Sequence, residues 1–357
     1  MKNDLLPSAN QKEVQKESEG CLKKYRYRIL LFLIVLGLFG VYYNYLENMN
    51  ELEKMFEDFV HVYEKRYRSQ QEKDHRFSIF MRNVRKHEED EKRHNGINLG
   101  VTQFSDRTDD ELKSLLVPIS SSNGITQSYS LETQGKTSST DHPAHFDWRE
   151  RNHVTPIKDQ GYCGSCWAFS TVATVESLNS IKRGKLISLS EQEILDCNPK
   201  YYGCSGGTTA SAMEFVREIG LCTEEEYKYR AADSEKCLRT KNLTRISIDA
   251  YIFLPKNETF VANWIAKNGP VTFAMTTTRP LLFYRSGIYH PSSEDCADKS
   301  LGSHAMAIVG YGSEKGKDYW IVKNSWGKNW GENGYLRLIR GKQVCSMMDR
   351  VVAPVIN

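Results

Sequence analysis

The 357-residue sequence predicts an α+β protein in which a helix-rich part precedes a strand-rich part. Residues 50–84 carry apolar side chains at helical spacing, which predicts amphipathic helices. Residues 166–196 predict two more helices, and the second opens with the capping pattern Ser190-x-x-Glu193. Farther on, β-rich runs between glycine-rich turns predict strands over 270–275, 305–309 and 319–323.

Composition and charge narrow the class of protein. Hydrophobic residues make up 39% of the chain and charged residues 26%, with a net charge of +3, so neither a nucleic acid nor an acidic partner is indicated. There are nine cysteines, and eight of them lie from Cys163 onwards, which favours an oxidising compartment. Sequons at Asn242 and Asn257 predict N-glycosylation and indicate the same compartment.

The N-terminal part predicts a membrane anchor. Residues 1–24 are polar and lack apolar periodicity, which predicts a cytoplasmic tail without regular structure. Residues 25–46 form an apolar segment with basic residues on its N-terminal side and Tyr at both edges, long enough to cross a bilayer. We expect an uncleaved signal anchor of a type II protein. A cleaved signal peptide, giving a secreted protein, is the competing interpretation, but no small-x-small cleavage site follows the segment.

The candidate chemistry centres on Cys166, which stands where a glycine-punctuated loop leads into a helix. A helix N-terminus favours a thiolate over a thiol. His304 follows about 140 residues later and Asn324 about 20 beyond it, which is the chain order of a Cys-His-Asn nucleophilic site. Cys163-x-x-Cys166 also fits a redox motif or half a zinc site, but no second such pair completes a metal site. No metal or cofactor is expected.

The run Cys163-Gly-Ser-Cys-Trp167 resembles the nucleophile signature of papain-family cysteine proteases, and the resemblance covers roughly residues 50–357. It implies a papain-like two-domain fold, with a helical left domain and a β-barrel-like right domain within residues 143–357. It also implies roles for individual residues. Asn324 would orient His304, Trp326 would shield their hydrogen bond, and the Gln160 side-chain amide with the Cys166 N–H would stabilise the oxyanion.

Residues 47–119 resemble the propeptides of this family. The spacing from Glu72 to Asn83 matches the first part of the ERFNIN signature, whereas His87 and Glu91 stand where Ile and Asn are usual. Gly100-x-Thr-x-Phe-x-Asp106 resembles the second propeptide motif, in a form closest to cathepsin F. The resemblance therefore implies an N-terminal helical inhibitory pro-domain that lies along the active-site cleft. Residues 120–142, rich in Ser, Thr, Gly and Gln, predict a linker where activating cleavage occurs.

The family's three disulfides imply the pairs Cys163–Cys204, Cys197–Cys237 and Cys296–Cys345, although spacing alone leaves the connectivity open. Cys222 is left over and is expected to be a buried free thiol. The resemblance also implies a set of substrate-contact positions: Gly206, Gly207, Thr208, Thr209, Ala274, Ala305, Trp326 and Arg350.

Arg350 is the unusual member of that set. It occupies the position that in the family lies at the floor of the S2 pocket, where a guanidinium would favour an acidic P2 residue. The alternative is that Arg350 pairs with Asp349 or extends into solvent.

Together these features predict a membrane-anchored, acid-activated zymogen of a cathepsin F-like or cathepsin L-like cysteine endopeptidase in a lysosome-like or secretory compartment. Its expected partners are peptide and protein substrates, its own propeptide and cystatin-like inhibitors, and it is expected to be a monomer. A catalytically silent homologue that binds peptides or inhibitors is the alternative, and a pure membrane tether would not explain the propeptide motifs.

Overall fold

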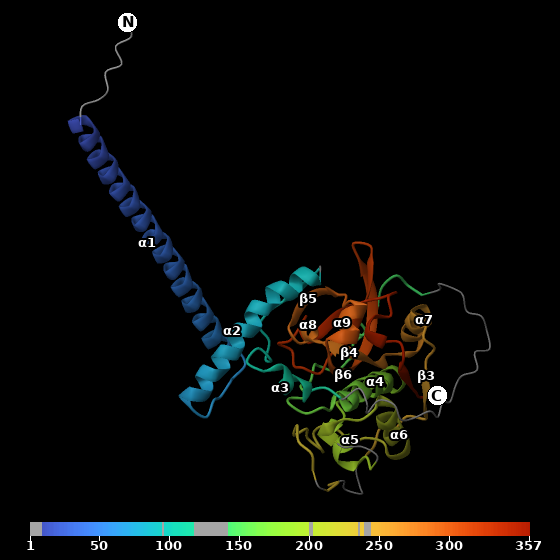
Figure 1. Cartoon of the computed structure of the whole chain (residues 1–357). Coiled ribbons are helices and arrows are strands. Elements are labelled where there is room, and N and C mark those ends of the chain that lie inside the picture. The colour runs from blue at the N-terminus through green and yellow to red at the C-terminus, as the bar shows by residue number, and fades with distance from the viewer. Residues whose placement is uncertain (1–8, 95, 118–141, 200–202, 235, 239–243) are drawn as a thin grey trace. The chain divides into compact units, whose positions relative to one another are not determined.

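The computed structural model describes residues 9–94, 96–117, 142–199, 203–234, 236–238 and 244–357. The chain divides into two compact units, Met1–Arg66 and Tyr67–Asn357, and each is described by itself (Figure 1). The predicted linker up to residue 141 and the sequon at Asn242 lie outside the described residues.

The first unit is built on one long helix, α1 (Ala9–Val62). From Lys24 on, this helix is long and apolar enough to cross a membrane, judged by length and composition alone; a cleaved signal sequence meets the same criteria. The expectation of a tail without regular structure is wrong for residues 9–24, because the helix already begins at Ala9. No proline stands between Pro7 and Pro118, so nothing in this stretch blocks the helix.

The second unit begins with the part of the predicted pro-domain that follows Arg66. Helix α2 (Gln70–Arg93) is capped by Ser69, whose side chain accepts a hydrogen bond from the Glu72 N–H. Strand β1 (Ile97–Leu99) and the short helix α3 (Asp109–Lys113) follow. Asn83 of α2 donates to the carbonyls of Ser105 and Arg107, at 2.8 and 2.9 Å. The matched propeptide residues therefore fix α2 to the segment that precedes α3.

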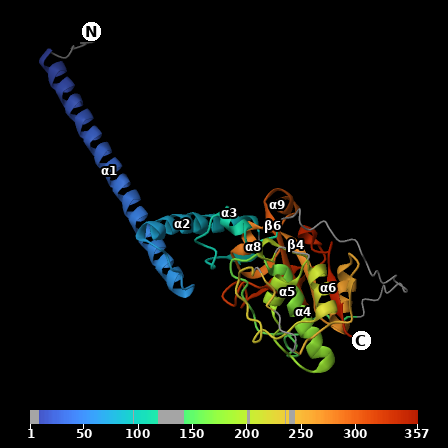
Figure 2. The ribbon, with the colours of Figure 1, turned by 90° about the horizontal axis from the view of Figure 1, so that it is seen from below.

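A helical region follows and surrounds α4 (Cys166–Arg183), which is buried from Cys166 to Ser180 and lies between α6 and strand β6 (Figures 1 and 2). Ser190 caps α5 (Glu191–Cys197) through the Glu193 N–H, as its sequence pattern predicts. The other elements of this region are β2 (Phe146–Asp147), the 3-10 turn η2 (Gly203–Ser205) and α6 (Thr209–Ile219).

The C-terminal region is a mixed sheet in the order β1-β5-β8-β7-β6-β4-β9-β3, with β2 paired to β6. Three predicted strands lie within it as β4, β6 and β7. Its strands are β3 (Ala250–Phe253), β4 (Val271–Thr278), β5 (Tyr284–Tyr289), β6 (Ser300–Glu314), β7 (Lys317–Lys323), β8 (Tyr335–Ile339) and β9 (Val352–Val355). Its helices are α7 (Glu258–Asn268), α8 (Arg279–Leu282), α9 (Ser293–Asp298) and η3 (Val344–Ser346).

The mature region has two hydrophobic cores. One gathers the helices around Trp167, Val172 and Leu178, and the other packs the sheet around Phe273 and Trp320. This arrangement confirms the predicted α+β two-domain architecture. The structure also contains the three expected disulfides, Cys163–Cys204, Cys197–Cys237 and Cys296–Cys345, and Cys222 is a free and buried thiol.

Candidate active site

Cys166 is the first residue of α4, as the sequence predicts, and it is fully buried. The loop before it is held by the Cys163–Cys204 disulfide and by a 2.9 Å hydrogen bond from the Gly164 N–H to the Cys204 carbonyl. A Cβ on Gly164 would lie 2.4 Å from that carbonyl oxygen, so only glycine permits this close approach. Cys166 packs in the same buried cluster as Ala305 of β6, the residue after His304.

His304 and Asn324 come from neighbouring antiparallel strands. His304 lies on β6, and Asn324 directly follows β7, the strand paired with β6. The His304 Nε2 lies 2.7 Å from the Asn324 Oδ1, which also accepts a hydrogen bond from the Ser325 N–H. Because Oδ1 is an acceptor, Nε2 carries the proton and Nδ1 is left as the basic nitrogen. Trp326 stacks on the imidazole with ring centroids 4.3 Å apart, so it covers this hydrogen bond.

Gln160 has its side chain fixed on both ends. Its Oε1 accepts a hydrogen bond from the Ser325 hydroxyl at 2.6 Å, which orients Nε2 away from Ser325. Nε2 donates to the Cys163 carbonyl at 2.8 Å and to the Leu115 carbonyl at 3.3 Å. Leu115 belongs to the pro-domain, so an amide donor at the site already contacts a peptide carbonyl.

The pro-domain covers the site. Val117 forms a two-way antiparallel bridge with Ser303, with N–H to carbonyl distances of 2.9 and 2.8 Å. Farther upstream, β1 pairs with β5, and Phe104 packs edge-to-face on Trp326 at 5.2 Å. The described pro-domain thus contacts the sheet at β5, the tryptophan beside His304 and the backbone next to it. Cys166 and His304 are both 0% exposed.

Burial sets the protonation of Cys166 and His304 in this covered state. It raises the pKa of the Cys166 thiol to about 11 and lowers the pKa of His304 to about 4. The proton therefore stays on the sulfur, and the pair is neutral. The thiolate that the helix N-terminus predicts at Cys166 therefore concerns the enzyme freed of its propeptide.

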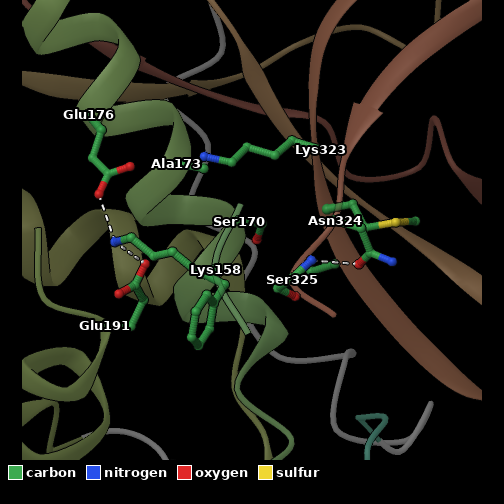
Figure 3. Close-up of a pocket in the computed structure, with 11 residues that line it drawn as sticks. Lys158, Ser170, Ala173, Glu176, Glu191, Lys323, Asn324 and Ser325 are labelled. Atoms are coloured by element: carbon green, nitrogen blue, oxygen red, sulfur yellow. Dashed lines mark hydrogen bonds and ion pairs between the residues drawn. The ribbon is translucent and has the colours of Figure 1, made fainter. Parts of the chain in front are cut away.

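A buried charged cluster lines a pocket together with Asn324 and Ser325, and it was not predicted from the sequence (Figure 3). The Lys158 ammonium lies 2.8 Å from both Glu176 of α4 and Glu191 of α5. Lys323, at the end of β7, donates to the Thr155 carbonyl and hydroxyl at 2.8 and 2.7 Å, and burial lowers its pKa to about 8. The cluster thus fixes the end of the strand that leads into Asn324.

The predicted substrate-contact residues are only partly brought together. Ala274 and Ala305 face each other across β4 and β6 and pack in the same cluster as Cys166. Gly206 lies against Val117. A Cβ added to Gly206 would lie only 3.0 Å from the Cγ1 of Val117. Thr208 caps α6, with Thr209 buried behind it. Arg350 is half-buried, and no hydrogen bond or ion pair of its side chain is found within the described residues; Asp349 pairs with Lys256 instead.

No group of three or more His, Cys, Asp and Glu side chains suited to a metal ion occurs in the part of the chain that the structure describes.

Comparison with known proteins identifies the family. Residues 142–355 match the papain family cysteine protease domain, and residues 56–112 match the cathepsin propeptide inhibitor domain. The chain belongs to the papain family of cysteine proteases. It is therefore a peptidase of this family preceded by its propeptide, and the resemblance drawn from the sequence motifs is confirmed.

Individual papain-family proteins align over most of the chain. Pro-cathepsin H of Bos taurus is 40% identical over 316 residues, covering 86% of this chain and 91% of that protein. Cathepsin F of Mus musculus is 34% identical over 311 residues, and the match spans 86% of this chain but 66% of that protein. The digestive procathepsin L2 proteinase of Tenebrio molitor superposes with a TM-score of 0.75 at 34% identity, covering 85% of this chain and all (100%) of that structure.

Proposed function

We propose that this chain is a cysteine endopeptidase that hydrolyses peptide bonds through Cys166, His304 and Asn324. The observation that carries the proposal is the hydrogen bond from the Gln160 amide to the Leu115 carbonyl. In this contact a backbone carbonyl of the pro-domain already accepts from the side chain that would stabilise the oxyanion formed by attack of Cys166. The imidazole supported by Asn324, with its Nδ1 free of other hydrogen bonds among the described residues, supplies the base.

In the proposed reaction, the Cys166 thiolate attacks the substrate carbonyl carbon and forms a tetrahedral oxyanion. The Gln160 Nε2–H and the Cys166 backbone N–H donate to that oxygen, a contribution of about 3–4 kcal/mol for such donors. The His304 imidazolium then protonates the departing amine, leaving a thioester on Cys166. His304 next takes a proton from water, whose oxygen displaces the thiolate and releases the carboxylic acid.

We further propose that acid releases the propeptide. Its contacts with the mature region include groups whose charge changes in acid. His87 of α2 packs on the Phe283 ring at 4.7 Å, and Arg279 lies near Asp90 and Asp109, at 3.8 and 3.6 Å. Protonating His87 next to this guanidinium weakens the docking.

Location is proposed on independent grounds. Three disulfides support an oxidising compartment, and the helix from Lys24 on supports a signal anchor with the protease on the lumenal or extracellular side. Asn257 is exposed and so is a candidate glycosylation site, while its side-chain oxygen caps α7. We propose that the chain is a type II membrane protein of a lysosome-like or secretory compartment. The alternative is a protein that is secreted after cleavage of the signal sequence.

Substrate choice and partners follow from the same site. We propose that Arg350 favours an acidic P2 side chain, with Thr208, Thr209, Ala274 and Ala305 forming small or polar walls. Two observations support this proposal: Arg350 is half-buried, and Asp349 pairs with Lys256, so the neighbouring carboxylate does not pair with Arg350. We also propose that the protein is a monomer and that cystatin-like inhibitors bind along the same site.

The test is labelling of the full chain with an active-site thiol electrophile before and after acid treatment, together with hydrolysis of a peptide amide. We expect labelling and hydrolysis after acid, and loss of both in Cys166→Ala. Release of the propeptide in acid without hydrolysis of the peptide amide would instead favour the catalytically silent, peptide-binding homologue.

A further inference from the structure

The hydroxyl of Tyr229 lies between the two chain segments that supply the proposed oxyanion donors. It donates to the backbone carbonyl of Gln160 at 2.8 Å and lies 2.7 Å from the hydroxyl of Ser165, the residue before Cys166. The ring of Tyr229 packs edge-to-face on Phe169 of α4, with centroids 4.8 Å apart. One side chain therefore contacts the Gln160 segment, the residue before the nucleophile and the first turn of its helix.

The direction of both hydrogen bonds follows from the atoms involved. A carbonyl oxygen only accepts, so the single phenol proton of Tyr229 is committed to Gln160. The Ser165 hydroxyl must then be the donor to the Tyr229 oxygen. Burial holds the pKa of Tyr229 above its usual range, so the phenol stays protonated and this pattern persists wherever the enzyme works.

We propose that Tyr229 is a positioning residue that fixes the spacing between the Gln160 amide and the Cys166 N–H, and thereby the stabilisation of the oxyanion. This inference rests on the proposed function. Gln160 is 0% exposed, and its N–H is already bound to the Ser325 carbonyl at 2.8 Å. Its backbone is thus held by Ser325, the residue after Asn324, on one side and by Tyr229 on the other, and removing the phenol oxygen leaves the Gln160 carbonyl without this donor.

Such a role has a defined kinetic signature. Donors to an oxyanion act over a narrow range of distances, and a small displacement of one of them lowers the rate of the chemical step more than it lowers substrate affinity. Iodoacetamide alkylates the thiolate by displacement of iodide, without forming an oxyanion that these donors would have to stabilise. The rate of alkylation should therefore not depend on the spacing between the two donors.

The experiment compares Tyr229→Phe with Tyr227→Phe, after the full-length proteins have been processed in trans by an aspartic protease. Tyr227 is a matched control two residues away, and its hydroxyl bonds to Asp196 of α5 instead. For Tyr229→Phe we expect kcat for a peptide amide to fall about tenfold with KM unchanged, together with a similar loss of affinity for a peptide aldehyde. The pH profile and rate of iodoacetamide alkylation should match those of the wild type.

A double-mutant cycle with Gln160→Ala decides whether Tyr229 acts through Gln160. The loss caused by Tyr229→Phe should largely disappear in the Gln160→Ala background. Ser165→Ala removes the hydrogen bond between Ser165 and Tyr229 and a longer one, at 3.5 Å, to the Cys163 carbonyl, but leaves the bond from Tyr229 to Gln160. It should give a smaller loss, and it replaces Tyr229→Phe in the experiment if that variant folds poorly.

Additive losses, or a Tyr229→Phe enzyme indistinguishable from Tyr227→Phe, would overturn the positioning role while leaving the proposed function intact. A wild-type enzyme that neither hydrolyses the amide nor reacts with iodoacetamide would overturn the proposed function, and the positioning role with it.

Discussion

His87 offers a sharp test of how the propeptide is released. The residue lies on α2, packs on Phe283 and stands where papain-family propeptides usually have an apolar side chain. Its Nε2 is buried without a hydrogen-bond partner among the described residues. Burial, and secondarily the charge of Arg279, lowers its pKa to about 4 from the ordinary 6.5. Asp90 and Asp109 face Arg279 and reduce its influence.

The sign and size of the effect follow from this shift. The docked state holds His87 neutral, whereas the released state binds a proton as pH falls below about 6.5, so docking weakens between pH 6.5 and pH 4. Between pH 7 and pH 5 the linked free energy is about 2 kcal/mol, or roughly twentyfold in the docking equilibrium. His87→Leu removes this contribution and also removes an unpaired polar group from the interface.

The assay follows the rate at which an active-site electrophile labels Cys166 in the full-length zymogen at fixed pH. His75→Leu is the control, because His75 is an exposed histidine on the same helix. Taking the ratio of the two variants at each pH cancels the intrinsic pH dependence of the thiol. We expect the labelling rate of His87→Leu, divided by that of His75→Leu, to be roughly twentyfold lower at pH 5 than at pH 7. Parallel profiles for the two variants would refute the reasoning.

Three further predictions concern the pair, the topology and the specificity. In the processed enzyme, alkylation of Cys166 should give a bell-shaped pH profile with its acid limb well below the ordinary thiol pKa of about 8.5; a single sigmoid near that value would contradict the ion pair with His304. In microsomes, Asn257→Gln should remove a glycan while an N-terminal tag remains open to cytosolic protease, and a protected tag would exclude the type II anchor. A P2 scan should show acidic residues gaining over Leu, with Arg350→Ala reversing the order; a Leu preference unchanged in that variant would end the specificity hypothesis.

Local sequence signals predicted the elements that carry the nucleophile and its partner. Cys166 begins a helix because a glycine-punctuated loop precedes a run of helix-compatible residues, and β4, β6 and β7 are β-rich runs separated by glycine. The catalytic assignments and the three disulfides rested on resemblance instead, since neither follows from spacing alone. The pairings are confirmed, and the catalytic roles remain to be tested.

Long-range partners could not be predicted in the same way. Strand β1 has only three residues and includes the polar Asn98, so its strand character comes from pairing with β5 nearly 190 residues later. Lys158 carries no local sign that it will bridge Glu176 and Glu191. Tyr229 likewise lies in a loop whose sequence does not reveal that its hydroxyl reaches Gln160. Each depends on tertiary contacts between segments far apart in the chain.

Inhibition and the proposed catalysis use the same donors, and this explains how a pro-domain can be both tight and removable. The Gln160 amide bonds to the Leu115 carbonyl, and the Ser303 backbone is satisfied by Val117. When the propeptide leaves, the Gln160 amide keeps its bond to the Cys163 carbonyl but loses the one to Leu115, and the Ser303 backbone loses Val117, so both can bind a substrate backbone. The free energy that holds the pro-domain at the site is therefore drawn partly from groups that a substrate can satisfy equally well. Under the proposed release by acid, weakening only the contacts outside the site, around His87 and Arg279, would allow substrate to compete.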